Sequence, residues 1–548
     1  MDISSHTIHR LPTMSWASLL CTSALMAVIY CVIVLPVYNV YFHPLRRYPG
    51  PTLFAASSLC WGYWYRSGFW HEKVQELHKE YGHIVRVAPD ELSFDIPEAW
   101  DEIYARKDSK MENRRPEFFI SSKLHYIISA NESDQKRMKS VLAPGFSYAA
   151  LTEQEPIIRR NMDLFIRHIR EASCAGKKPI NFMRWVNYLT FDIIGELLFG
   201  ESFGCVAGNE KLRAWQDLLI SNLQLLHIIC VSKRIWVFWL AMPWRDMYNL
   251  ITQFTHFDKL IGTIVSDRLA GHTPDRNDLF ELMKQGRRAN VSRLESAGLS
   301  PSESASLINA VSKCMTQEEI LANANLLTFA GSESSANSTA SLLYRISADE
   351  ALKTRLLSEL HANFRSEDEI TSVKAMALPF LRAVIEEGLR LHPVTPNALW
   401  RITPKQGNKI FEDWLPGNTV LSIHHRAMYR SEHNFKRAEE FIPERWMPNS
   451  DIYPEFANDR RNAFHPFSCG PRMCPARNLG YAEISIILAR VLWSFDIVVA
   501  EESRHWRESL KGWVLWEKRP FWLYLIPRQE HVDDEPKTAE SRNDNSHS

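Results

Sequence analysis

A short segment near the C-terminus combines residue types that could do chemistry at fixed spacing. From Pro466 to Gly480 the chain reads PFSCGPRMCPARNLG, in which an aromatic, a glycine, an arginine and a cysteine stand at fixed spacing. Phe467 can shield a sulfur from water, and Gly470 permits a turn that a side chain would block. Arg472 can pair with a haem propionate. Cys474 then remains as the residue that offers one thiolate to the haem iron.

An apolar pattern with helical spacing follows Cys474. The residues that repeat along it are Leu479, Ala482, Ile486, Ala489 and Trp493. Pro475 stands in the first turn, where a helix tolerates a missing N–H. Cys474 would therefore lie at a helix N-terminus, where backbone N–H groups and the helix dipole lower the pKa of a thiol. Cys469 is the alternative ligand, but it precedes the glycine turn and no helix follows it directly.

The segment from Phe467 to Cys474 resembles the haem-binding loop of the cytochrome P450 family, whose members are haem-thiolate monooxygenases. The resemblance implies the cytochrome P450 fold, mainly α-helical with a small β-rich lobe. It also implies haem as the cofactor, with Cys474 as the axial ligand of the iron. A thiolate ligand pushes electron density onto iron and favours O–O cleavage. The N-terminal region and the YFHPLRRYPGP junction are most similar to microsomal members from filamentous fungi.

A second motif lies in the helical segment LPFLRAVIEEGLRLHP. Glu387 and Arg390 stand three residues apart in it, so they share one helix face and can pair. Taken alone, such a pair is most often an ordinary surface ion pair. The downstream segment FIPERW resembles the family loop whose arginine joins this pair, which implies a buried triad of Glu387, Arg390 and Arg445. Because buried charges are tolerated only when they are paired, we expect the triad to fix the scaffold behind the haem.

A long helix is predicted to begin at Thr316, with Glu319 completing a capping box. Its middle reads AGSESSANS, where small polar residues stand in place of the leucine that a buried helix prefers. Close helix packing explains such a stretch as well as a functional site does. The family resemblance implies an oxygen-binding groove here, with Gly331 leaving space for O2 and Glu333 and Ser334 relaying protons. The family usually has threonine where Ser334 stands, so the hydroxyl is kept but its rotamer is less restrained.

Three further residues are expected near the haem propionates. In NESDQKRMKSVLAPGFS the family typically has an aromatic residue or histidine at Gln135 and an arginine at Lys139. Gln135 can still donate a neutral hydrogen bond, and Lys139 offers a point charge without the arginine fork. Arg401 matches a family arginine that contacts a propionate. A solvated basic helix face is the competing interpretation, and it explains Lys136 and Arg137 better.

Composition limits the remaining possibilities. The chain has 548 residues, 45% of them hydrophobic, and 64 basic against 64 acidic side chains. A chain of this length can bury a large core, and its balanced charge argues against a nucleic acid as partner. The nine cysteines lack the paired spacing of a disulfide framework.

The N-terminus predicts a membrane anchor. The segment from Met14 to Pro36 is apolar and uncharged, close to the roughly 20 residues that cross a bilayer. A buried helix or a cleaved signal is the alternative, but the apolar run continues towards Tyr41. Arg46 and Arg47 then supply the basic flank that faces the cytosol. We therefore expect a single-pass protein of the endoplasmic reticulum membrane with its catalytic domain in the cytosol.

The predicted organisation is a lumenal N-terminus at 1–13, an anchor at 14–36, a proline-rich hinge at 37–51, a catalytic domain at 52–528 and an unstructured polar tail at 529–548. The segment YGHIVRVAPDELSF alternates as a pair of short strands would. A serine-rich stretch from Ser292 to Ser312 is interpreted as a surface insertion. Core packing, or an entry surface that dips into the bilayer, explains an aromatic cluster formed by Trp236, Phe238, Trp239 and Trp244.

The resemblance implies a monooxygenase that inserts one oxygen atom from O2 into an apolar small molecule at the membrane lipid surface, in terpenoid or polyketide secondary metabolism. The sequence has no phosphate-binding glycine loop, so electrons are expected from a separate NADPH-dependent reductase, with cytochrome b5 as an optional second donor. Two alternatives stay open: a haem-thiolate isomerase or dehydratase that does not activate O2, and a non-catalytic haem- or lipid-binding membrane protein. Gly331, Glu333 and Ser334 favour oxygen activation.

Overall fold

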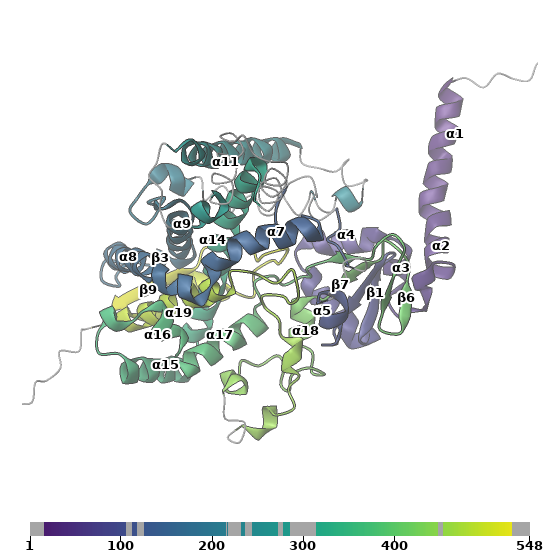
Figure 1. Cartoon of the computed structure of the whole chain (residues 1–548). Coiled ribbons are helices and arrows are strands. Elements are labelled where there is room, and N and C mark those ends of the chain that lie inside the picture. The colour runs from purple at the N-terminus through teal and green to yellow at the C-terminus, as the bar shows by residue number, and fades with distance from the viewer. Residues whose placement is uncertain are drawn as a thin grey trace, which may run out of the picture.

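The computed structural model describes residues 16–105, 112–117, 125–214, 216, 229, 232–235, 244–271, 278–284, 314–447 and 453–528. Figure 1 shows a helical body with a smaller lobe of strands beside it, and one long N-terminal helix that stands away from both. Most described residues are helical, and the strands form three small sheets. The predicted fold class, mainly α with a small β-rich lobe, is confirmed.

The N-terminal helix consists of α1 (Trp16–Ile29), a π-helical turn (Tyr30–Val34) and α2 (Leu35–Tyr41). Its segment Leu19–Tyr41 has a mean hydropathy of 2.4 and is long enough to cross a membrane. Its most apolar stretch is not buried in the protein, whereas Asn39 near its end is buried. The helix passes through Pro36 and ends at Tyr41, beyond the predicted end of the anchor. The π-helical turn just before this proline adjusts the hydrogen-bond pattern where the proline N–H is missing.

The predicted hinge is fastened to the β-rich lobe. Asn39 donates from Nδ2 to the carbonyl of Ala56 at 2.9 Å, and its own carbonyl accepts from Nη1 of Arg86 at 2.9 Å. Arg47 pairs with Asp413 at 2.9 Å. These contacts hold the end of the anchor against the lobe, so the hinge residues are part of its structure.

The small lobe contains a four-stranded sheet in the order β1-β2-β7-β4. The predicted strand pair is confirmed, since β1 (Ile84–Ala88) runs antiparallel to β2 (Glu91–Phe94). Next come β7 (Val420–Ser422), parallel to β2, and β4 (Arg401–Ile402). A hairpin of β5 (Asn408–Ile410) and β6 (Asp413–Leu415) lies beside it. The lobe also includes α3 (Thr52–Ala56), α4 (Ser58–Ser67), α5 (Trp70–Tyr81), α6 (Ala99–Ile103) and α18 (His425–Tyr429).

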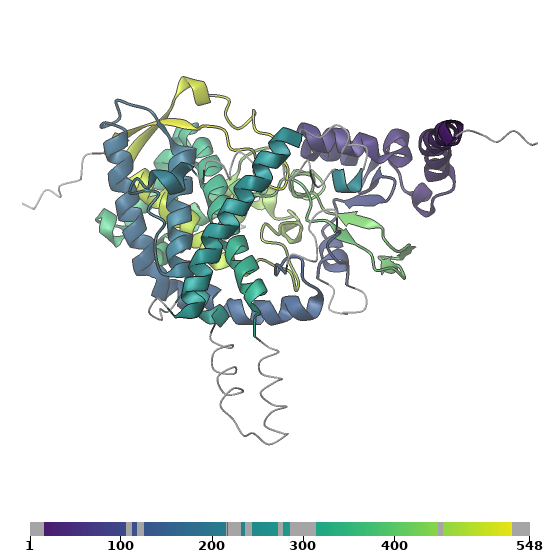
Figure 2. The same cartoon turned by 90° about the horizontal axis from the view of Figure 1, so that it is seen from above.

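The helical body is built around α14 (Gln317–Ser347), which packs against its neighbours on several sides (Figure 2). The other helices are α7 (Glu132–Leu142), α8 (Tyr148–Ala172), α9 (Phe182–Phe199), α11 (Trp244–Ala270), α15 (Glu350–Asn363), α16 (Ser372–Met376), α17 (Pro379–Leu391) and α19 (Arg477–Ser494). The body also contains a three-stranded sheet, in the order β3 (Ile180–Asn181), β9 (Trp522–Pro527), β8 (Phe495–Val499).

The start of α14 has the predicted capping box. Thr316 accepts from the N–H of Glu319 at 3.2 Å, and the Glu319 carboxylate accepts from the N–H of Thr316 at 2.8 Å. Arg137 of α7 also pairs with Glu319 at 2.5 Å. Arg137 therefore joins two helices, and the solvated basic face predicted for it is wrong.

Three regions named from the sequence lie partly or wholly outside the described residues: Trp236, Phe238 and Trp239, the serine-rich stretch at 292–312, and the tail from Gln529. Trp244 is described, and it is 58% exposed at the start of α11. Core packing therefore does not account for Trp244.

Candidate cofactor site

The loop before Cys474 has a shape that depends on Gly470. This glycine has φ +71°, and an added Cβ would lie 2.4 Å from the Tyr104 carbonyl oxygen and 2.6 Å from Cα of Ala105. No side chain can occupy that space. The loop then folds back on itself, because the Cys474 N–H donates to the Phe467 carbonyl at 3.0 Å. Gly470 thus lets the loop approach the β-rich lobe and turn towards Cys474.

The helix predicted after Cys474 is α19, and it begins at Arg477. Its N-terminal environment does not lower the pKa of the thiol overall, contrary to the prediction. Burial raises the pKa of Cys474, and it outweighs the Ala476 N–H and the Lys139 ammonium, which favour the thiolate. A metal bound at Cys474 would displace this proton, since metal coordination deprotonates a thiol outright.

Cys469 lies in a different environment from Cys474. Its sulfur is 3.7 Å from the carbonyl oxygen of Trp100, and the residue packs at the edge of the small lobe. Burial raises the pKa of Cys469 to about 11. Cys469 therefore serves the contact between the loop and the lobe, and Cys474 remains the predicted iron ligand.

Arg401 has the properties expected of a residue that binds an anionic cofactor. It is 2% exposed and donates through Nη1 to the carbonyls of Leu399 and Trp400, at 3.2 and 3.1 Å. Its Nη2 is buried and has no hydrogen-bond partner. Burial lowers the pKa of Arg401 to about 10. A buried guanidinium with a free donor fits a carboxylate such as a haem propionate.

Two other arginines lie near Arg401. Arg115 has its pKa lowered to about 9, first by burial and then by the charges of Arg401 and Arg472. Arg472 donates to the Glu112 carboxylate at 2.5 Å and to the Ala130 carbonyl at 3.0 Å. Repulsion between these arginines lowers the pKa values of Arg115 and Arg401, and the Glu112 carboxylate offsets part of the positive charge. Propionates bound beside Arg401 would offset more of it. The residues present therefore fit haem.

Gln135 and Lys139 contact the cysteine loop directly. Nε2 of Gln135 donates to the Pro471 carbonyl at 3.1 Å, and Nζ of Lys139 donates to the same carbonyl at 2.8 Å. A further bond joins Nζ of Lys139 to the Met473 carbonyl at 3.3 Å. Both residues belong to α7, and their hydrogen bonds hold the cysteine loop against this helix. Their contact with a propionate stays a prediction.

The three residues of the predicted triad lie together and are buried. Glu387 accepts from Nε and Nη2 of Arg390, both at 2.8 Å, and from Nε of Arg445 at 3.2 Å. The Trp446 indole and the Ile442 N–H also donate to Glu387, each at 2.8 Å. Burial alone would raise the pKa of Glu387, but the two arginines outweigh it and hold this pKa below its usual value. The network ties α17 to the loop that precedes the cysteine segment.

Gly331 and Ser334 stand three residues apart in α14, so they are neighbours on one face of the helix. A Cβ at Gly331 would lie 2.8 Å from Cγ1 of Ile194, so this glycine permits close packing of α14 on α9. The Ser334 hydroxyl donates to the Ala330 carbonyl at 2.7 Å. Close packing, the alternative left open by the sequence, is sufficient to explain Gly331. Its role in an oxygen groove stays a prediction.

Glu333 is fully buried and forms an ion pair with Lys518, which is also buried. Lys518 donates as well to Oδ1 of Asn187 on α9. Burial lowers the pKa of Lys518, and the Glu333 charge opposes this effect. The predicted proton-relay acid is therefore held by a cation from the segment just before β9.

Replacing Lys518 by methionine should destabilise the folded protein by about 3 to 5 kcal/mol, because the Glu333 carboxylate would stay buried without its cation. The double variant Lys518→Met/Glu333→Gln should recover most of this loss. Thermal and urea unfolding of the single and double variants measure the coupling. Additive losses in the double variant would show that the two side chains do not depend on each other.

Glu483 on α19 is a buried carboxyl that the sequence reasoning did not single out. Its Oε2 accepts from the Ser335 hydroxyl at 2.5 Å, and its Oε1 has no hydrogen-bond partner. Burial raises the pKa of Glu483 to about 8. Glu483 is thus a neutral acid at pH 7, and it lies beside the small polar stretch of α14.

The raised pKa of Glu483 predicts a pH-dependent loss of stability. The folded state binds this proton more tightly than the unfolded chain, whose pKa is 4.5, so the free energy of unfolding falls between about pH 4.5 and 8. Glu483→Gln should remove this loss and be more stable than the wild type at pH 8.5, by on the order of 3 kcal/mol. Unfolding at pH 5 and 8.5 tests this, with Glu501→Gln as control, since the Glu501 side chain is 73% exposed. Parallel pH profiles for all three proteins would contradict it.

The sequence reasoning also missed Arg115 and Lys518. Arg115 follows directly on Arg114 in the segment NRRPEFF, and Lys518 lies in WEKRP. Neither segment has a spacing that distinguishes it from solvated surface. Only their burial beside other charges identifies them.

Comparisons with known proteins agree with this geometry. The family model described as Cytochrome P450 matches residues 50–524. The chain is 40% identical over 515 residues to "Cytochrome P450 monooxygenase bet2" of Neocamarosporium betae, covering 94% of each protein. It is 41% identical to "Cytochrome P450 monooxygenase sthF" of Phaeosphaeria nodorum, covering 92% of this chain and 94% of the relative. It is 34% identical to "Averantin hydroxylase" of Dothistroma septosporum, covering 90% and 88%.

Proposed function

The chain belongs to the cytochrome P450 family, and from this premise we propose that it is a membrane-anchored monooxygenase that inserts one oxygen atom from O2 into an apolar small molecule of secondary metabolism. Terpenoids and polyketides are the substrate classes we propose. Similarity to fungal monooxygenases over most of the chain supports the reaction type. One relative is named as a hydroxylase of a small molecule, averantin.

Members of this family carry haem with a cysteine thiolate as axial ligand, and they take electrons from a redox partner. The bound haem supplies O2 activation, and the protein supplies its ligand, proton path and pocket. We propose Cys474 as the ligand. Its loop turns at Gly470, and the Cys474 N–H donates to the Phe467 carbonyl. Arg401, Arg472, Lys139 and Gln135 would hold the haem propionates and the loop. The observation that carries this assignment is the buried, incompletely satisfied guanidinium of Arg401.

On α14, we propose that the Ser334 hydroxyl and the Glu333 carboxylate hold and move the protons that oxygen chemistry consumes, with Gly331 as part of the same groove. Glu333 must leave or share its ion pair with Lys518 to do so. Glu387, Arg390 and Arg445 are assigned a structural role, because their charged atoms contact one another, nearby backbone groups, the Trp446 indole and the Asp459 carboxylate.

The proposed location is the endoplasmic reticulum membrane, with the catalytic domain at about 52–528 facing the cytosol. The apolar N-terminal helix supports anchoring, and Arg46 and Arg47 supply the basic flank. Electrons would come from an NADPH-dependent reductase, with cytochrome b5 as an optional donor, and membrane lipid would surround the anchor.

Expression of the full chain with a fungal reductase, followed by product analysis with terpenoid and polyketide candidates, tests the substrate class. The expected product is one oxygen heavier than its substrate and appears only when NADPH is present. Turnover of neither class would contradict the proposed substrates. A product with the same number of oxygen atoms as its substrate would favour the isomerase, and a product that has lost water would favour the dehydratase.

A further inference from the structure

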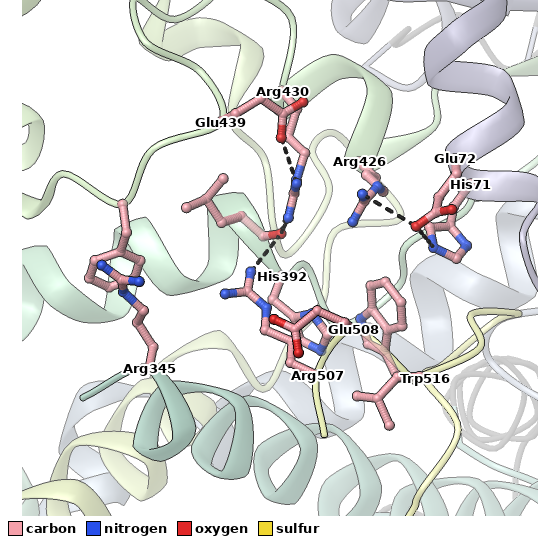
Figure 3. A pocket seen from close by; sticks show the side chains of 13 residues that line it. His71, Glu72, Arg345, His392, Arg426, Arg430, Glu439, Arg507, Glu508 and Trp516 are labelled. Carbon is pink, nitrogen blue, oxygen red and sulfur yellow. Dashed lines mark hydrogen bonds and ion pairs between the residues drawn. The ribbon is translucent and has the colours of Figure 1, made fainter. Parts of the chain in front are cut away.

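A polar cavity of about 300 Å³ is lined by residues of both the β-rich lobe and the helical body (Figure 3). Its walls come from the start of α5, the ends of α14 and α17, the short helix α18 and the segment from Arg507 to Trp516. None of its lining residues belongs to the site assigned above. The proposed function therefore leaves this cavity unexplained.

Arginine side chains surround the cavity. Arg426, Arg430 and Arg507 project towards it from two different segments, and Arg345 lies at one end (Figure 3). Burial lowers the pKa values of Arg430 and Arg507 to about 10, and repulsion from neighbouring arginines adds to the effect. Cations are thus held close together at a cost in free energy.

The carboxylates of the cavity do not neutralise these arginines evenly. Arg430 pairs with Glu439 at 2.6 Å, and Arg426 lies 3.6 Å from Glu72. Both glutamates are nearly half exposed, with 46% and 49% of their side chains accessible. Among the described residues, Arg507 has no carboxylate within ion-pair distance, and its Nη2 donates only to the Leu391 carbonyl at 3.3 Å. Nε of Arg426 is buried without a hydrogen-bond partner.

Two buried histidines line the cavity beside the arginines. His392 is 4% exposed and stacks on Trp516 at 4.1 Å between ring centroids, and His71 is 1% exposed and meets the same ring edge-on at 4.8 Å. Nε2 of His392 has no hydrogen-bond partner, and His71 lies against the Gly512 backbone. Burial lowers both histidine pKa values well below the usual range, so both rings are neutral at pH 7. A neutral ring can donate to an anion through one nitrogen.

We propose that this cavity binds a phosphate-type anion, which bridges Arg426, Arg430 and Arg507. Several guanidinium groups that approach from different directions suit a tetrahedral anion with several acceptor oxygens. The anion would come either from solution or from the headgroup of an anionic membrane lipid. Because its walls include the ends of α14 and α17, an anion bound here would fasten the helix that carries Glu333 to the helix that carries Glu387.

The test uses the full-length haem-loaded protein in phosphatidylcholine nanodiscs, in phosphate-free buffer of constant ionic strength. Inorganic phosphate should bind saturably by calorimetry and raise the unfolding midpoint, since a ligand of the folded state stabilises it. Arg507→Gln should bind phosphate about tenfold more weakly or worse and lose the rise. Arg504→Gln is the matched control, because the Arg504 side chain is 66% exposed three residues earlier; it should behave as wild type.

The sign of the Arg507→Gln effect separates a ligand site from a structural arginine. Without phosphate the variant should be at least as stable as wild type, because it removes a repelling buried charge; with phosphate it should be less stable than wild type. A loss of stability of equal size in both buffers would overturn the proposal. So would a rise in midpoint that chloride reproduces at the same ionic strength.

A second arm distinguishes the source of the anion. Nanodiscs that contain phosphatidic acid, without free phosphate, should stabilise wild type but not Arg507→Gln if the ligand is a lipid headgroup. Stabilisation by dissolved phosphate alone identifies a soluble anion. If neither treatment stabilises wild type more than Arg507→Gln, the cavity is not an anion site.

Discussion

Replacing Cys474 by serine should abolish the haem-thiolate centre while leaving the chain folded. A serine hydroxyl cannot supply the electron-rich sulfur ligand, so any haem that still binds should lack the Soret band that thiolate-ligated, reduced haem shows with carbon monoxide. The variant should form no product at the expense of NADPH. The measurement is the reduced carbon monoxide difference spectrum, together with haem bound per chain.

Cys469→Ser is the matched control for this experiment. Cys469 lies in the same loop, and its sulfur faces the Trp100 carbonyl. A serine there keeps a donor for that carbonyl, so the spectrum should be that of wild type. A thiolate spectrum that survives Cys474→Ser but disappears in Cys469→Ser would reverse the assignment of the ligand.

The second large effect is expected at Glu387. Glu387→Gln removes the buried negative charge that Arg390 and Arg445 share, while Arg445 keeps its ion pair with Asp459. The Arg390 guanidinium would then face an amide in place of a carboxylate. Breaking a buried ion pair in this way costs about 3 to 5 kcal/mol. Because the network ties α17 to the loop before the cysteine segment, we expect the variant to accumulate without bound haem.

The measurement is the ratio of haem to protein after purification, compared with that of Glu350→Gln. Glu350 also pairs with a nearby lysine, but its side chain is 77% exposed, so its loss should change little. The lowered pKa of Glu387 gives a further check. Its stabilising charge is fully present above the unfolded pKa of about 4.5 and is lost as pH falls through the folded value. Full haem loading of Glu387→Gln would contradict the structural role of the network.

The parts of this protein that are predictable from sequence are those fixed by local backbone requirements. Gly470 is needed because a side chain would strike the Tyr104 carbonyl, and a glycine at that spacing from a cysteine is visible in the sequence. The capping box of α14 and the apolar anchor are equally local. The membership of the cytochrome P450 family, expected from the cysteine loop, is confirmed by the family match.

Other features depend on contacts between distant segments. Lys518 pairs with Glu333 across more than 180 positions of sequence, and no spacing rule connects them. The pKa of Cys474 was predicted to be lowered because a helix start is a local feature, whereas its burial, which raises the pKa, results from packing of the whole loop. The packing role of Gly331 also depends on a distant segment, since Ile194 of α9 packs against this glycine.

The most direct test of the central claim is oxygen labelling with the full chain, a reductase, NADPH and the substrate found by product analysis. Under ¹⁸O2 in unlabelled water, a monooxygenase that acts through Cys474-bound haem should transfer one ¹⁸O atom to the product, and Cys474→Ser should transfer none. A product formed by the wild type without any ¹⁸O would contradict the account, because the chain would then transform its substrate without inserting oxygen from O2.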